Sequence, residues 1–234
     1  MKISMKKRKI GYTYGSSSGV YSFRNEKSIQ FESLLEKDFI QLMDFNDNVI
    51  DIIEQPITIE YTTIKGNKGT YTPDFLVLFK APQYTNQNPI KPLLVEVKPT
   101  KKLKDNWDTL KIKFKNIITY SKLKDYQFKI FNENRIRSQK LKNIVFLHRF
   151  KEYTPNPDDI NIIKNHLASI GHTTIEYIIT HLFVTDLQKG NAIAHIWYLV
   201  YIKEISCDLS LKITNNTVIW LNTEEDNLGL NYEY

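Results

Sequence analysis

The 234-residue chain is 41% hydrophobic and 25% charged, so it has enough apolar side chains for one core and a second, smaller one. Its one cysteine, Cys207, excludes an internal disulfide, and no Cys/His cluster has the spacing of a zinc site. The net charge is +6. No apolar run is long enough for a membrane span or a signal peptide, so we expect a cytoplasmic protein.

The N-terminal quarter is predicted to consist of a flexible arm followed by regular secondary structure. Residues 1–27 have no clear period and are rich in Lys, Ser, Gly and Tyr, which indicates a basic arm. Apolar residues then recur at helical spacing, which predicts an amphipathic helix over residues 28–45 with Ser28 as its N-cap. Short β-branched runs predict strands at residues 49–53 and 57–61.

The core of the predicted first domain follows. Two apolar runs, at residues 75–79 and 93–97, are typical of buried strands. Beyond them the pattern predicts a helix at 107–123, a strand at 126–131 and a basic helix at 133–141. The alternation of strands and helices favours a mixed α/β domain over residues 28–150.

A second domain is expected after a proline-containing linker at residues 151–157. Helical patterns at 160–170, 174–183 and 192–202 precede two alternating runs, 207–213 and 217–220, which flank a predicted turn at Asn215-Asn216. Three helices and a hairpin in this order favour a small winged-helix-like domain over residues 158–234.

Three charged residues at the ends of the core strands point to metal chemistry. Glu96 and Lys98 are two positions apart on a strand, so they face the same side. If the strands at 75–79 and 93–97 are neighbours, Asp74 meets Glu96 across the ladder. Two carboxylates and a main-chain carbonyl, here that of Val97, form an oxygen site suited to Mg²⁺, for which Mn²⁺ is expected to substitute. Such a site can hydrolyse a phosphodiester.

The pattern of Pro-Asp, a spacer and Glu-x-Lys resembles that of the nuclease superfamily of type II restriction enzymes and Holliday-junction resolvases. This resemblance implies a restriction-endonuclease-like sheet flanked by helices. It also implies that Asp74, Glu96 and Lys98 are catalytic.

Four segments narrow the resemblance: Phe31-Glu-Ser-Leu-Leu-Glu-Lys-Asp-Phe39, Val49-Ile-Asp-Ile-Ile-Glu-Gln-Pro56, Tyr71-Thr-Pro-Asp-Phe75 and Val95-Glu-Val-Lys-Pro99. Over about residues 28–150 the chain resembles TnsA, the endonuclease subunit of heteromeric cut-and-paste transposases. The resemblance implies a fourth catalytic residue and metal ligand, Glu36, on the preceding helix, with Glu32 as the competing candidate. It also implies cleavage of the strand at the transposon 5′ ends, together with a TnsB-like transposase and a TnsC-like ATPase regulator.

The charge distribution suggests where double-stranded DNA binds. Residues 101–149 carry 14 basic against 4 acidic residues, and residues 150–234 carry 5 against 11. A positive segment attracts the phosphate backbone. The lysines that follow the proposed site most closely are Lys101, Lys102, Lys104, Lys111, Lys113 and Lys115. The acidic second domain is better suited to a protein partner such as the ATPase, although a structural or dimerisation module is an alternative.

Two other functions are compatible with the same residues and charge distribution. A standalone restriction or junction-resolving nuclease would use the same four residues and recognise DNA unaided. A non-catalytic DNA-binding scaffold could retain the fold, but the complete set of Glu36, Asp74, Glu96 and Lys98 argues against it. Gln55 could bind a phosphate or water, or Gln55-Pro56 could simply shape a bend.

Overall fold

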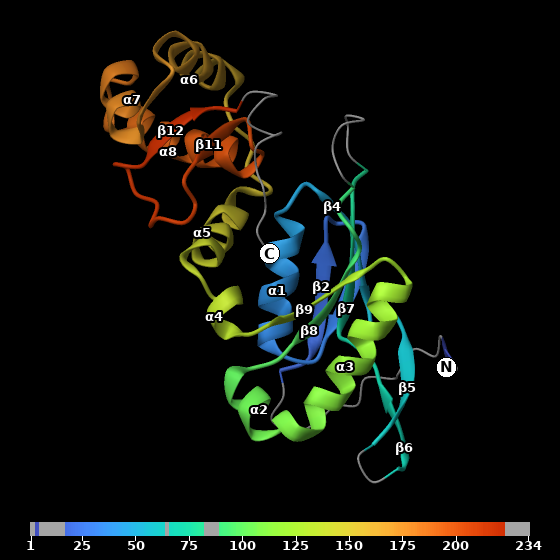
Figure 1. Ribbon diagram of the computed structural model, residues 1–234. Coiled ribbons are helices and arrows are strands. Elements are labelled where there is room, and N and C mark those ends of the chain that lie inside the picture. Colours follow the sequence, from blue (N-terminus) through green and yellow to red (C-terminus); the bar gives the residue numbers. More distant parts are fainter. Residues whose placement is uncertain (1–2, 5–16, 64–65, 82–88, 223–234) are drawn as a thin grey trace. The chain divides into compact units, whose positions relative to one another are not determined.

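The computed structural model describes residues 3–4, 17–63, 66–81 and 89–222 (Figure 1). The chain divides into two units, Met1–Arg137 and Ser138–Tyr234. Among the described residues, no helix is both long and apolar enough to cross a membrane.

A four-stranded mixed sheet forms the centre of the first unit. Its strands, in spatial order, are β4 (Val49–Glu54), β7 (Phe75–Phe79), β8 (Leu93–Val97) and β9 (Gln127–Phe131). Neighbours are antiparallel except β8 and β9, which are parallel and therefore need a crossover connection. That connection contains α2 (Thr100–Asp105) and α3 (Trp107–Leu123). Strand β8 is a central strand of this sheet, and its five residues are all buried.

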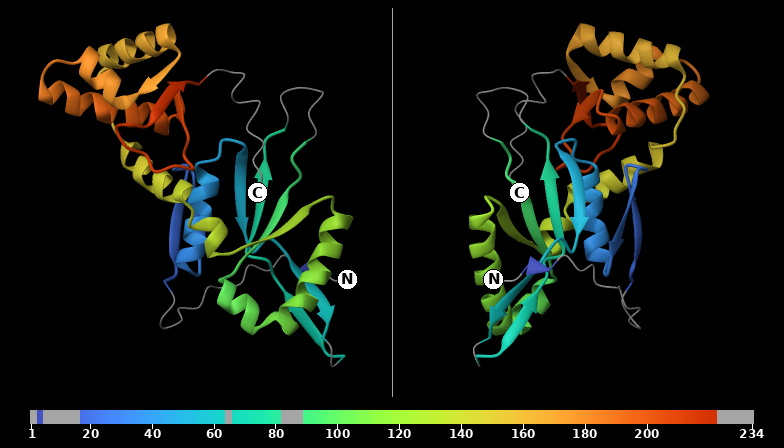
Figure 2. Two further views of the ribbon diagram at one scale, coloured as in Figure 1. Left: turned by 60° about the vertical axis from the view of Figure 1, so that its left-hand side comes forward. Right: turned by 90° about the vertical axis from the view of Figure 1, so that its right-hand side faces the viewer.

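Helices α1 (Leu34–Asp44) and α3 cover opposite faces of this sheet (Figures 1 and 2). On the α1 face, Phe39 packs against Phe75 and Phe131, with ring centroids 5.5 and 5.0 Å apart. On the other face, Phe114 of α3 packs against Phe128 of β9 at 5.7 Å. The expected mixed sheet flanked by helices is thus confirmed.

The proposed catalytic residues of β8 lie on the sheet face that α3 covers with a buried apolar cluster. Leu94 belongs to this buried cluster. Side chains alternate along a strand, so Glu96 and Lys98 share the face of Leu94. Burial of Glu96 follows directly from its position on a covered face.

Two hairpins extend the first unit. Strands β5 (Thr58–Thr62) and β6 (Lys68–Tyr71) pair with each other, and β1 (Ile3–Ser4) pairs with β5. Strands β2 (Gly19–Phe23) and β3 (Lys27–Phe31) form the second hairpin. The expectation that residues 1–27 form an arm without regular structure is therefore wrong for β1 and β2, while residues 1–2 and 5–16 lie outside the described residues.

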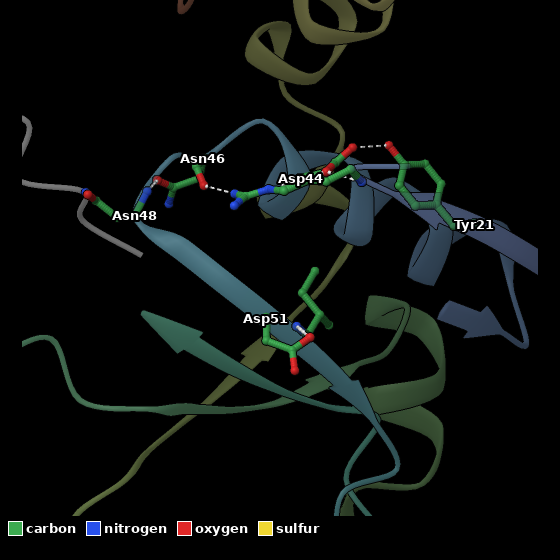
Figure 3. A network of polar contacts seen from close by, with 7 residues as sticks. Tyr21, Asp44, Asn46, Asn48 and Asp51 are labelled. Atoms are coloured by element: carbon green, nitrogen blue, oxygen red, sulfur yellow. Dashed lines mark hydrogen bonds and ion pairs between the residues drawn. The ribbon is translucent and has the colours of Figure 1, made fainter. Parts of the chain in front are cut away.

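The β2–β3 hairpin is attached to the end of α1 by polar contacts. Arg24 and Asn25 form its turn with φ of 50° and 59°. The Tyr21 hydroxyl donates to Asp44 Oδ2 at 2.8 Å, and Arg24 Nη2 donates to the carbonyl of Asn46 at 3.0 Å (Figure 3). This network fixes one end of the helix whose other end carries Glu36.

Two predicted helix boundaries are wrong. Helix α1 begins after Ser33, not Ser28, because Ile29 and Phe31 alternate on strand β3 and bury one face of it. The single basic helix predicted over residues 133–141 is two helices, α4 (Glu133–Ile136) and α5 (Gln139–Leu147), and the division between the two units falls in this break.

The second unit contains helices and a small antiparallel sheet. After α5 and a 3₁₀ turn (His148–Phe150) come α6 (Pro157–Ile170), β10 (His172–Thr174), α7 (Ile175–Leu182), α8 (Asp186–Tyr201), β11 (Ile205–Cys207) and β12 (Val218–Leu221). The sheet order is β10-β12-β11. The three expected helices are present, whereas the strand predicted over 207–213 ends at Cys207, so β11 and β12 are not joined by a tight turn at Asn215-Asn216. The winged-helix character of this unit stays a prediction.

The segment expected to be a linker, residues 151–157, lies within the second unit. The hydroxyl of Tyr153 is 2.9 Å from His195 Nδ1, and the Asn156 N–H donates to His195 Nε2 at 3.1 Å. A buried histidine thus holds this segment against α8.

Candidate active site

Asp74 lies immediately before β7, held through both its main chain and its carboxylate. Its carbonyl accepts the Gln55 N–H at 2.8 Å, and its Oδ2 accepts the Val97 N–H at 2.6 Å. Phe75 pairs with Val95 in the antiparallel ladder, so Asp74 lies beside Glu96. The meeting of these two carboxylates across neighbouring strands follows the prediction made from their spacing.

Glu96 is a buried carboxylate with a donor at each oxygen. Its side chain is only 3% exposed. Oε2 accepts the Tyr71 hydroxyl at 2.7 Å, and Oε1 contacts the Lys98 ammonium. The Lys98 side chain is 26% exposed, so this residue lies at the edge of the buried site. The Lys98 N–H donates to the carbonyl of Phe131 at 2.9 Å, which fixes this end of β8 against β9.

Glu36 is in the first turn of α1, where it also takes part in helix capping. The N-cap Ser33 accepts the Glu36 N–H at 3.2 Å and donates its hydroxyl to Glu36 Oε1 at 2.9 Å. The Glu32 N–H donates to Glu36 Oε2 at 2.7 Å. These reciprocal bonds resemble a capping box and leave the carboxylate with a defined orientation.

The carboxylates influence one another electrostatically. Burial raises the pKa of Glu36, and the charges of Glu32 and Glu96 add to that effect, against the hydrogen bonds from Glu32 and Ser33. Burial and the charges of Glu96 and Glu36 raise the pKa of Asp74 well above its usual range, although the Val97 N–H and Lys98 act in the opposite direction. Glu36, Asp74 and Glu96 therefore form one acidic cluster whose members influence one another's protonation.

The chemistry of this cluster fits a hard divalent cation. Its donors are carboxylate oxygens, the ligands that Mg²⁺ prefers, and a cation would relieve the repulsion that raises the pKa of Asp74. With the side chains as they stand, no group of three or more His, Cys, Asp or Glu in the described part of the chain is close enough to hold a metal ion. Both carboxylate oxygens of Glu36 and of Glu96 accept hydrogen bonds or ion-pair contacts in this arrangement.

Glu32 and Gln55 form a pair beside the cluster. Gln55 has φ of 45°, a left-handed conformation that bends the chain between β4 and β5 and confirms the bend predicted at Gln55-Pro56. Its Nε2 donates to Glu32 Oε1 at 3.2 Å. The charge of Glu36, in contrast, acts directly on Asp74. This arrangement favours Glu36 over Glu32 as the helix-borne carboxylate of the site.

The predicted DNA-binding lysines lie on two helices that follow the site. Helix α2 begins at Thr100, two residues after Lys98, and α3 follows it. Of the six lysines, Lys113 is half-buried and the others are exposed; Lys101, Lys102 and Lys104 are on α2, and Lys111, Lys113 and Lys115 are on α3.

Sequence reasoning missed two residues that hold the catalytic candidates, Tyr71 and Ser33. Burial and the charge of Glu96 raise the pKa of Tyr71, so its phenol stays protonated and donates to that carboxylate. The only signal for Ser33 was its position three residues before Glu36, the spacing of a capping box.

Comparison with known families gives two matches. A model described as TnsA-like endonuclease N terminal matches residues 46–133, a range that contains Asp74, Glu96 and Lys98 and begins after Glu36. A model described as TnsA endonuclease C terminal matches residues 135–209. No curated protein matches the chain. The two matches adjoin within α4, a few residues before the division between the two structural units. The chain belongs to the TnsA family and is a nuclease connected with transposition.

Proposed function

We propose that this protein is a Mg²⁺-dependent DNA endonuclease that hydrolyses the strand at the transposon 5′ ends together with a partner transposase. The observation that supports this most is the cluster of Glu36, Asp74 and Glu96 beside Lys98. Burial of the cluster, and then the repulsion among its carboxylates, raises the pKa of Asp74 and of Glu36, which costs folding stability at neutral pH. Such costly clusters are typical of functional sites.

The proposed ligands of the metal ion are Glu36, Asp74, Glu96 and the main-chain carbonyl of Val97. A bound Mg²⁺, or Mn²⁺ in its place, would act as a Lewis acid and would lower the pKa of water for attack on the phosphodiester. The protein residues contribute orientation, because each of the three carboxylates is held by main-chain or side-chain donors.

Lys98 is proposed to stabilise the negative charge that develops on the phosphate during hydrolysis. Its ammonium is partly exposed and is paired with Glu96. A lysine ammonium at this edge of the site can approach a bound phosphate and stabilise the charge that develops on it.

The lysines of α2 and α3 are proposed to bind the DNA backbone. They are predominantly exposed and lie on the two helices directly after the catalytic strand. Phosphate contacts hold DNA without reading its sequence, so recognition of the transposon ends would come from a TnsB-like transposase. We propose that the second unit binds a TnsC-like ATPase regulator.

The test compares nicking of transposon-end DNA by the full chain, alone and with the transposase of the same element, in Mg²⁺ and in Mn²⁺. Asp74→Asn and Lys98→Ala should each reduce nicking by at least about a hundredfold, since catalytic groups of this kind contribute on that scale. The transposase should be required for cleavage at the 5′ ends.

Matched controls come from the exposed ion pair of Lys91 and Asp125, whose Nζ and Oδ1 atoms are 2.6 Å apart. Lys91→Ala and Asp125→Asn make the same chemical changes away from the cluster, so they should leave nicking unchanged. Specific cleavage without the transposase would favour a standalone nuclease. Equal inactivity of the wild type and both site variants, with the transposase present, would contradict catalysis.

A further inference from the structure

Tyr71 connects the proposed catalytic carboxylate Glu96 to the hairpin and helix beside it. It is the last residue of β6, pairs with Ile59 of β5 and is 6% exposed. Its ring lies edge-on to Phe114 of α3, with centroids 6.2 Å apart. The ring is therefore fixed by packing, and its hydroxyl donates to Glu96 Oε2 at 2.7 Å. A rigid phenol is a precise donor because packing already restricts its rotamers.

The two donors of Glu96 differ in exposure to solvent. Tyr71 is buried, whereas the Lys98 side chain is 26% exposed. A lysine ammonium at the edge of the site is attracted to any phosphate that enters it. If Lys98 turned toward a bound phosphate, its contact with Glu96 Oε1 would weaken, whereas the hydrogen bond from Tyr71 to Oε2 would remain. A buried carboxylate without either donor would be strongly destabilised.

We propose that Tyr71 is a positioning residue, which holds the Glu96 carboxylate in place while Lys98 engages the scissile phosphate. This inference rests on the proposed nuclease function and adds a residue to it. Tyr71 contacts neither the DNA nor the water in this scheme. It acts through Glu96, as residues behind a metal ligand orient that ligand in other proteins.

The position of Tyr71 also places it next to the proposed DNA-binding helix. Phe114, against which its ring packs, lies on α3 between Lys113 and Lys115. Replacement by a small residue would disturb this packing as well as the hydrogen bond. Tyr71→Phe is the appropriate variant, because it keeps the ring and removes only the hydroxyl.

The matched control is Tyr120→Phe. Tyr120 lies on α3 in the same buried cluster and is also 6% exposed, and its substitution removes a tyrosine hydroxyl that does not donate to Glu96. Both variants, in the full chain, are assayed with the partner transposase for nicking of end DNA at several DNA concentrations. Mn²⁺ binding is measured separately by electron paramagnetic resonance, without turnover.

We expect Tyr71→Phe to lower kcat by about 10- to 100-fold and Mn²⁺ affinity by about tenfold, the range found for groups that orient a metal ligand. KM for DNA should change less than about twofold, because the lysines that bind the backbone are intact. Tyr120→Phe should match the wild type in all three quantities. A purely structural role of Tyr71 would instead lower the melting temperature and leave the kcat and Mn²⁺ affinity of the folded protein unchanged.

Two results would overturn the inference, and they are distinguishable. If the wild type cleaves the ends and Tyr71→Phe cleaves and binds Mn²⁺ equally well, the positioning role is wrong and the proposed function stands. If the wild type neither cleaves with its transposase nor binds Mn²⁺, the proposed function fails first and the role of Tyr71 fails with it.

Discussion

Replacement of Ser33 separates two tasks that this residue performs, capping of α1 and orientation of Glu36. Ser33→Ala removes the acceptor of the Glu36 N–H and the donor to Glu36 Oε1, which lie at 3.2 and 2.9 Å from their partners. Ser33→Gly removes the same hydroxyl, but glycine is tolerated at an N-cap. The two variants should therefore differ in stability and agree in activity.

The expected magnitudes follow from these contacts. Replacing an N-cap serine by alanine costs about 1 kcal/mol, and replacing it by glycine only a few tenths. For a chain of this size, about 1 kcal/mol corresponds to a lower melting temperature by about 2–4 °C in calorimetry. In both variants Glu36 keeps the hydrogen bond from the Glu32 N–H but not that from Ser33, so nicking should fall about tenfold.

Ser138 provides the control. It is the N-cap of α5, and its side chain accepts no capping hydrogen bond from the described backbone. Ser138→Ala should change neither melting nor nicking. If nicking falls in Ser33→Ala and is normal in Ser33→Gly, the decrease comes from the helix end alone, and the reasoning about Glu36 orientation is refuted.

Three further predictions concern charge. Because the pKa of Asp74 is raised in the folded state, folding retains its proton and stability falls as pH rises from the unfolded value of about 3.9. Asp74→Asn should therefore be more stable than the wild type at pH 7 in EDTA, with a smaller difference near pH 4; urea unfolding at both pH values tests the sign. Replacing Lys101 or Lys111 by alanine should lower the slope of log DNA affinity against log salt concentration by about one unit for each lost phosphate contact. An unchanged slope would exclude a contact between that lysine and the DNA backbone. Burial raises the pKa of the Cys207 thiol to about 12, so the native protein at pH 8 should react with a disulfide reagent far more slowly than the urea-unfolded chain.

The end of the sheet that carries the proposed catalytic residues was the most predictable part of the fold. The apolar runs beside Asp74 and Glu96 have strand length, and the period of two places Glu96 and Lys98 on one side. Helix α3 has the bounds that its apolar spacing predicts. These features depend on local pattern, which a single sequence contains.

Features that depend on tertiary packing were harder to predict from the sequence. Ile29 and Phe31 belong to a strand because β2 and α1 lie beside them, whereas their spacing was also compatible with a helical stripe. The burial of Glu96 requires both the cover by α3 and the phenol of Tyr71, which is 25 residues away in the chain. No local period reveals a hydrogen bond of that kind.

The parallel pairing of β8 with β9 joins segments on the two sides of α2 and α3, so we expect the site to be completed late in folding. Residues 36 and 98 can approach their final positions only as the sheet assembles, and the hydrogen bond from the Lys98 N–H to Phe131 closes the end of the catalytic strand. Contacts between segments so distant in sequence form slowly. A nascent chain that still lacks β9 would thus have every proposed catalytic residue but no completed sheet to hold them. Under the proposed function, the order of synthesis would itself delay the ability to cut DNA until the first unit is whole.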